Sequence, residues 1–186
     1  MKKLLPYFMV GWFVLILTLG VFVSLVVWAL NTPEGTRALL KTISTLTPLE
    51  IDTQEISGRL MDDLKIQGLQ IRWPQGELKA RFFHLQWRAT DLWNRRIIIQ
   101  EISLEGVHLK DDRTYTGKIS LHGWPTVPFW LSKIQGRVDS LQIQSMVYQR
   151  LQENPVSLDK LFTRLQWDGG VLGVTDFTLQ LSLIHI

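Results

Sequence analysis

The hydrophobic residues of this chain follow two patterns, one before and one after residue 33. Residues 4–33 contain no charged side chain, and Lys2 and Lys3 precede them. At a rise of about 1.5 Å per residue, a helix over residues 4–30 would be roughly 40 Å long, which exceeds the roughly 30 Å hydrocarbon core of a bilayer. The first pattern therefore predicts a signal-anchor transmembrane helix over residues 1–32.

A cleavable signal peptide is the alternative interpretation of this segment. The apolar region of such a peptide is about 7–15 residues long and ends at a small-residue cleavage site. The run here is longer, and Val27-Trp28-Ala29 is a poor cleavage signal. Lys2 and Lys3 favour a cytoplasmic N-terminus, and Arg37 and Lys41 on the far side weaken that preference.

A short helical pattern follows the apolar run. Thr32 suits an N-cap, Pro33 suits the first helical position, and Pro48 ends the segment. Apolar residues recur between the two prolines at helical spacing. The sequence therefore predicts a short amphipathic helical connector over residues 33–48.

From residue 49 onward, apolar and polar residues alternate, as is typical of half-buried β-strands. The alternation breaks at residues 89–95, where we expect a turn or a single helical turn. Gly169-Gly170 predicts a hairpin turn between two further strands. Residues 49–180 are therefore expected to form a β-rich domain.

One eight-residue pattern occurs three times in this domain. Residues 64–71 read LKIQGLQI, residues 102–109 read ISLEGVHL and residues 141–148 read LQIQSMVY, at offsets of 38 and 39. In each octet a small residue stands where the alternation slips by one position: Gly68, Gly106 and Ser145. We interpret these positions as β-bulges, which add one residue and redirect the following side chains. The repeat predicts stacked β units in an elongated sheet.

Composition narrows the chemistry. Without Lys2 and Lys3, 18 of the 20 Lys and Arg residues remain against 17 Asp and Glu, so the domain is nearly neutral and its composition does not indicate nucleic-acid binding. The chain has no cysteine, and its four histidines are scattered. Adjacent carboxylates such as Asp62-Asp63 are expected in turns, because neighbours on a strand point to opposite faces. We predict no catalytic site, no metal site and no cofactor, and hence no enzyme.

Several segments resemble the N-terminal part of the TamB family, the AsmA-like inner-membrane subunit of the translocation and assembly module. The most characteristic stretch is Ile56-Ser57-Gly58-Arg59-Leu60, which leads into Leu64-x-Ile66-x-Gly68-Leu69. Leu92-Trp93 and Ile102-x-Leu104-x-Gly106-Val107 fit the same pattern. The resemblance covers roughly residues 1–180 and is weaker after Asp112.

The resemblance implies a mainly β protein: an N-terminal transmembrane helix, a short amphipathic helix, and an elongated, repeat-like antiparallel sheet with an apolar concave face that forms a groove. It implies a single-pass inner-membrane protein with most of its mass in the periplasm. The implied function is phospholipid transport between inner and outer membranes. The alternative is a scaffold for outer-membrane protein assembly and autotransporter secretion, with a TamA-type barrel as partner through a C-terminal part absent here.

Lipid tails need a continuous apolar surface shielded from water, which one face of such a sheet would supply. The candidate groove positions are the apolar residues of the octets and of the strand between the first two: Leu64, Ile66, Leu69, Ile71, Leu78, Ala80, Phe82, Leu85, Trp87, Ile102, Leu104, Val107, Leu109, Leu141, Ile143, Met146 and Tyr148. Ordinary buried core is the alternative role for this set.

Two further interpretations stay open. The sheet edges could pair with client strands, which describes a scaffold, or a catalytic part could lie beyond residue 186. The chain stops within an apolar, strand-like segment, and we interpret it as a fragment of a longer protein. Residues 181–186 are a candidate non-native tail.

Overall fold

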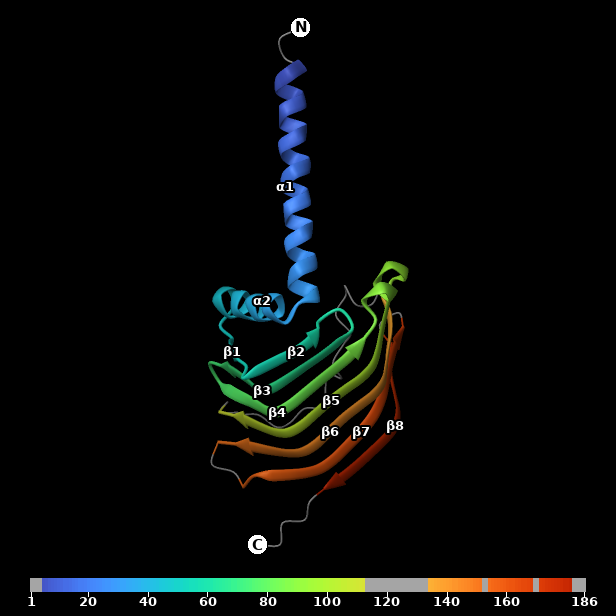
Figure 1. Ribbon diagram of the computed structural model, residues 1–186. Helices are drawn as coiled ribbons and strands as arrows, with labels where there is room; N and C mark the ends of the chain where they lie inside the picture. The colour runs from blue at the N-terminus through green and yellow to red at the C-terminus, as the bar shows by residue number, and fades with distance from the viewer. Residues whose placement is uncertain (1–4, 113–133, 152–153, 169–170, 182–186) are drawn as a thin grey trace.

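The computed structural model describes residues 5–112, 134–151, 154–168 and 171–181, with side-chain surroundings from residue 16 onward. Over these residues the chain forms two α-helices, one 3₁₀ helix and eight strands in a single sheet (Figure 1). The elements are α1 (Leu5–Asn31), α2 (Pro33–Leu46), β1 (Glu50–Asp52), β2 (Glu55–Arg59), β3 (Asp63–Trp73), β4 (Gly76–Trp87), η1 (Ala89–Asn94), β5 (Arg96–Asp111), β6 (Gln135–Arg150), β7 (Val156–Asp168) and β8 (Val171–Leu181).

The corner between α1 and α2 is built by small and hydroxylated residues. The Thr32 hydroxyl accepts a hydrogen bond from the Gly35 amide at 3.0 Å, which confirms the N-cap. Thr36 is fully buried, and its hydroxyl donates to the Thr32 carbonyl at 3.0 Å. A Cβ on Gly35 would lie 2.5 Å from the Ala29 Cα, so only glycine fits at this close approach.

The predicted helices are both present, and they meet at a sharp bend. No single helix in the described residues meets the length and hydropathy requirements for crossing a membrane. Ile16–Asn31 and Pro33–Leu46 meet them together as a pair bent by 103°. Lys2 and Lys3 lie outside the described residues.

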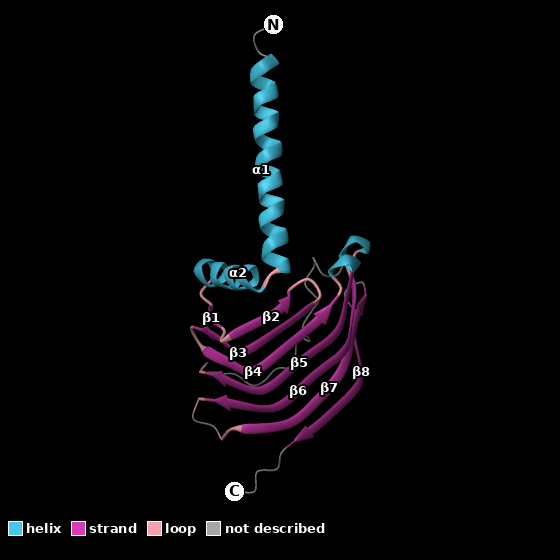
Figure 2. Ribbon diagram, in the orientation of Figure 1, coloured by secondary structure: helices cyan, strands magenta, loops and turns pink. Residues whose placement is uncertain are grey.

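The strands follow the order β1-β3-β4-β5-β6-β7-β8, with β2 also paired to β3. Figure 2 shows them as one layer, with both α-helices at the β1–β2 end. All pairs are antiparallel except β5–β6, which is parallel. The expectation of a wholly antiparallel sheet is therefore wrong at this pair, because alternation of side chains has the same period in both kinds of sheet.

The second and third octets lie side by side on β5 and β6, and β4 links the first octet, on β3, to the same register. Leu104 pairs with Ile143 across β5–β6, and Phe83 of β4 pairs with both Ile66 and Leu104. The same register holds along the octets, so equivalent positions of all three share one row across the sheet. The predicted repetition is therefore structural.

The interpretation of the small residues as one-residue bulges is wrong. Gly68, Gly106 and Ser145 all have left-handed backbone, with φ of 61°, 63° and 55°. The register is nevertheless the same on both sides of them, because Gln67 pairs with Phe82 and Leu69 with Ala80. On each strand, the alternation between the two faces shifts by one residue at this row. Because neighbouring strands shift together, their pairing is unchanged and neither strand has an extra residue.

The core gathers on one face of the sheet, near β2 and β3. It combines buried residues of β2, β3, β4 and β5: Ile56, Leu64, Ile66, Leu69, Ala80 and Val107. Leu40 of α2 packs against this cluster together with Ile51 and Leu60. The helical corner is thus attached to the apolar face at one end of the sheet.

Candidate functional site

Four rows of apolar side chains cross the sheet on one face, and we call them the apolar rows. From β3 to β6 or β7, the register gives Leu64, Leu85, Ile102 and Leu141; Ile66, Phe83, Leu104, Ile143 and Leu161; Leu69, Ala80, Val107, Met146 and Leu158; and Ile71, Leu78, Leu109, Tyr148 and Val156. Fifteen of the seventeen candidate groove residues belong to these rows. The octet pattern therefore located this face.

Phe82 and Trp87 are the two candidates outside the rows. Phe82 pairs with Gln67 and Glu105, so its side chain belongs to the polar face, and its placement on the apolar face is wrong. Phe83 takes that place and packs against the core cluster. Trp87 lies at the end of β4, where its indole donates to the Leu60 carbonyl at 2.6 Å.

The apolar rows are only partly covered. Leu64 and Ile66, at the β2 end, are each 4% exposed. Leu104, Ile143 and Tyr148 are only half-buried. The face therefore changes from a closed core near α2 to a partly open apolar surface over β5 and β6.

The opposite face is polar and held by ion pairs. Arg81 bonds Glu105 at 2.6 Å, and the His84 imidazole bonds the Asp63 carboxylate at 2.7 Å. Burial alone would raise the pKa of Asp63, but hydrogen bonds and charges from His84 and Lys65 outweigh it and lower that pKa below its ordinary value. These pairs leave the two faces with opposite character.

The rows run in a defined direction. They cross the strands, and the strands are stacked away from the base of α1 in the sheet order (Figure 1). Four strand-to-strand steps from β3 to β7, at about 4.8 Å each, give roughly 19 Å. The apolar surface therefore leads away from the long apolar helix.

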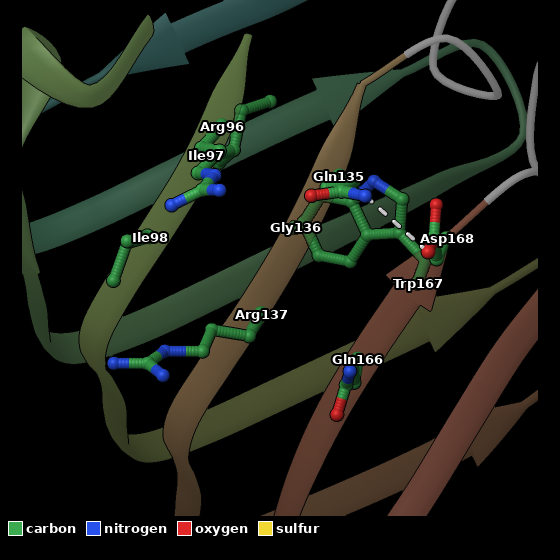
Figure 3. A pocket seen from close by; sticks show the side chains of 9 residues that line it. All are labelled: Arg96, Ile97, Ile98, Gln135, Gly136, Arg137, Gln166, Trp167 and Asp168. Carbon is green, nitrogen blue, oxygen red and sulfur yellow. Dashed lines mark hydrogen bonds between the residues drawn. The ribbon is translucent and has the colours of Figure 1, made fainter. Parts of the chain in front are cut away.

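A separate cavity of about 220 Å³ lies where β5, β6 and β7 meet the η1 end of the sheet. In Figure 3, Ile98 lies between the guanidinium groups of Arg96 and Arg137. The Trp167 ring covers Gly136, and among the described residues its buried indole nitrogen has no hydrogen-bond partner. A Cβ at position 136 would lie 1.9 Å from a Trp167 ring carbon, so this stacking requires glycine. The sequence pattern gives no signal for this cavity, because neither arginine belongs to an octet.

The face, the helical corner and the octets agree with one comparison. The chain matches TamB, N-terminal domain, over residues 22–186. The chain belongs to the TamB family. This match spans nearly the whole chain and confirms the resemblance carried by the octets. Comparisons with curated proteins and with solved structures gave no match.

Membership of the TamB family indicates a transport or assembly role in the cell envelope rather than catalysis. Among the described residues, no group of three or more His, Cys, Asp or Glu side chains is arranged to hold a metal ion. The candidate site of this TamB family chain is the surface formed by the apolar rows.

Proposed function

We propose that this chain is the membrane-anchored start of a periplasmic groove that contributes to phospholipid transport between the inner and outer membranes. The four apolar rows are the observation that carries the proposal. They provide one apolar surface through β3, β4, β5 and β6, with its polar side turned away.

The membrane anchor in this proposal is α1, the helix that precedes α2 and the sheet. α1 has 27 residues and is roughly 40 Å long. Ile16–Asn31 does not meet the requirements for a membrane span by itself, and in this proposal the whole of α1 crosses the bilayer with some tilt. Its described part exposes large apolar side chains on all sides, from Ile16 to Trp28. A helix that is apolar all round requires an apolar surrounding. The inner membrane supplies it in this proposal, with the sheet in the periplasm.

The corner supports this placement. A cavity of about 310 Å³ in the inner angle of α1 and α2 is lined mainly by apolar residues, including Leu25, Trp28, Leu39 and Ile43. On an adjoining side of α2, Leu40 packs against the core cluster of the sheet. α2 would therefore lie along the membrane surface, with one apolar side toward lipid and another toward protein.

The dimensions suit acyl chains. One leaflet contributes about half of the roughly 30 Å hydrocarbon core, or about 15 Å. The rows extend roughly 19 Å away from α1, as far as β7. A tail leaving the bilayer would exchange one apolar environment for another, which avoids the cost of exposing it to water.

Site-specific photo-crosslinking in cells tests the proposal. A crosslinking residue at Leu104 or Ile143 should capture phospholipid, because both positions are half-buried members of the second row. The matched controls are Glu105 and Gln144, the next residues on the same strands, which pair with each other on the polar face. Equal capture on both faces, or none on either, would contradict transport along the rows.

A scaffold for outer-membrane protein assembly and autotransporter secretion is the second candidate, with a TamA-type barrel as partner. It is supported by family membership and by the β8 edge. In the described sheet β8 pairs only with β7, and it exposes Val171, Phe177 and Leu181. Crosslinks from these positions to a client strand, without lipid capture at Leu104, would favour the scaffold.

A further inference from the structure

An exposed tryptophan stands at the tip of η1. Trp93 is 91% exposed, the largest exposed fraction among the large hydrophobic side chains of the described residues. Leu92 beside it is 43% exposed. Tryptophan is enriched where protein meets the membrane–water interface, because its ring is apolar and its N–H is polar. Two adjacent exposed apolar side chains, one of them a tryptophan, indicate a contact surface.

The start of η1 is linked to the end of α1. The Asn31 side chain, on the last residue of α1, contacts the Met61 sulfur at 3.5 Å. The Met61 carbonyl in turn accepts a hydrogen bond from the Ala89 amide, the first residue of η1, at 3.2 Å. In Figure 1 the green η1 coil lies at the level of α2 and the base of α1, at the end of the sheet that is nearest to α1.

The tip is held in a fixed geometry. Ala89 is buried, and Arg95 has a left-handed backbone with φ of 55° that ends η1. The Arg95 amide donates to the Leu92 carbonyl at 2.9 Å, and the Arg95 carbonyl accepts from Gln135 at 3.2 Å. Leu92 and Trp93 are thus presented by an anchored turn.

The charges beside the tip are cationic. Arg95 and Arg96 are exposed and follow η1 directly. Within the residues that the structure describes, neither has a carboxylate partner, whereas Arg88 pairs with Asp91 at 3.4 Å. Free guanidinium groups suit phosphate oxygens, which they bind in a planar, two-pronged geometry.

We infer that the η1 tip, residues 92–96, binds the anionic headgroup surface of the bilayer that α1 enters. Leu92 and Trp93 reach the interfacial region, and Arg95 and Arg96 bind lipid phosphates. This inference rests on the proposed membrane anchor. With α2 and η1 both on the membrane surface, the sheet is held at two separate places. The apolar rows then run away from the bilayer instead of lying along it.

A depth measurement tests the inference on the full chain in nanodiscs of phosphatidylethanolamine and phosphatidylglycerol. The chain has no cysteine, so a single introduced cysteine takes one fluorescent label. Asn94→Cys labels the tip and keeps Trp93, while Phe22→Cys labels α1 and Gln180→Cys labels the distant strand β8. A quencher carried on the lipid should quench the label at position 94 several-fold more than the label at position 180.

The label on α1 separates the inference from the anchor. Quenching at position 22 with none at position 94 would overturn the tip contact and leave the anchor in place. No quenching at position 22 would overturn the anchor itself. Trp93→Ala in the Asn94→Cys background should reduce quenching at position 94 and leave position 22 unchanged. Arg95→Gln with Arg96→Gln should do the same only when phosphatidylglycerol is present. An unchanged signal in both variants would overturn the assigned roles.

Discussion

Leu104 of β5 lies directly beside Ile143 of β6 on a parallel pair of strands, and the two residues are 39 positions apart in the chain. This separation equals the offset between the second and third octets, so the sequence period is the register of the pair. The first octet joins the same rows through β4, where Phe83 pairs with both Ile66 and Leu104. The repeated pattern thus supplies the continuous apolar face on which the proposed function depends.

The first prediction concerns Leu104. Leu104→Asp places a carboxylate without a partner on the apolar face, and burying such a charge against acyl chains is strongly unfavourable. Lipid movement between the membranes should fall sharply in the full-length protein, while its membrane level, measured by immunoblot, stays normal.

The matched control is Ser103→Asp, one residue earlier on β5. Ser103 pairs with His84 on the polar face, so an added carboxylate meets water and an imidazole. Transport should be retained in this variant. A loss as severe as that of Leu104→Asp would contradict a special role for the apolar face.

The sequence predicted most of the sheet, because alternation reports which side chains share a face. It placed fifteen residues of the apolar rows and both helices. It did not predict the parallel β5–β6 pair, since a strand alternates in the same way beside either kind of neighbour. The second and third octets have the same pattern read in the same chain direction, and this was the available signal for a parallel pair.

The position of the phase change in β4 was harder to predict. The alternation in the sequence predicts Phe82 on the apolar face, whereas in the structure Phe83 occupies it. The β4 residue opposite both Gly68 and Gly106 is Arg81, so β4 has no glycine to mark where its phase changes. Two adjacent phenylalanines fit either phase, so only the pairing of strands distinguishes them.

The second prediction tests this assignment through the two phenylalanines. Phe83→Ala removes a ring packed against the core cluster and should lower the free energy of unfolding by about 2–3 kcal/mol, less than for a fully buried ring. Phe82→Ala removes a ring on the polar face and should cost at most about 1 kcal/mol. Denaturant unfolding of the full chain in detergent, followed by tryptophan fluorescence, measures both. Equal losses would contradict the register.

The third prediction concerns acid stability. Partial burial would raise the pKa of Asp63, but hydrogen bonds and charges from His84 and Lys65 lower it below its ordinary value of 3.8. The ionised carboxylate therefore stabilises the fold fully at pH values above 3.8. This contribution should disappear as the pH falls through the lowered pKa. Asp63→Asn should therefore be less stable than the parent chain near neutral pH, and the difference should shrink below pH 3.8.

The partner variant Lys65→Met provides the comparison for this effect. It should reduce the pH-dependent difference without abolishing it, because His84 still contacts Asp63 at 2.7 Å. The Asp63 side chain is 46% exposed, so solvent screening keeps the effect small. A difference that stays constant from neutral to acid pH would show that Asp63 acts through packing alone.

The fourth prediction concerns the three octet residues with left-handed backbone, which we call the left-handed row: Gly68, Gly106 and Ser145. Gly106 has φ of 63°, and a Cβ there would lie 3.0 Å from the Arg81 Cβ, so Gly106→Val combines backbone strain with crowding. We expect a loss of about 1–2 kcal/mol in unfolding free energy. Gln144→Val is the control, since Gln144 lies exposed on the neighbouring strand and has no positive φ. A β-branched residue is well tolerated at such a position.

Ser145 allows the same strain to be relieved instead of imposed. It occupies the equivalent place in the third octet with φ of 55°, a conformation that costs serine more than glycine. Ser145→Gly should therefore leave the unfolding midpoint unchanged or raise it, whereas Ser145→Val should lower it as Gly106→Val does. If valine were tolerated at both positions, the left-handed row would not set the change of phase, and the two faces of the sheet would need another explanation.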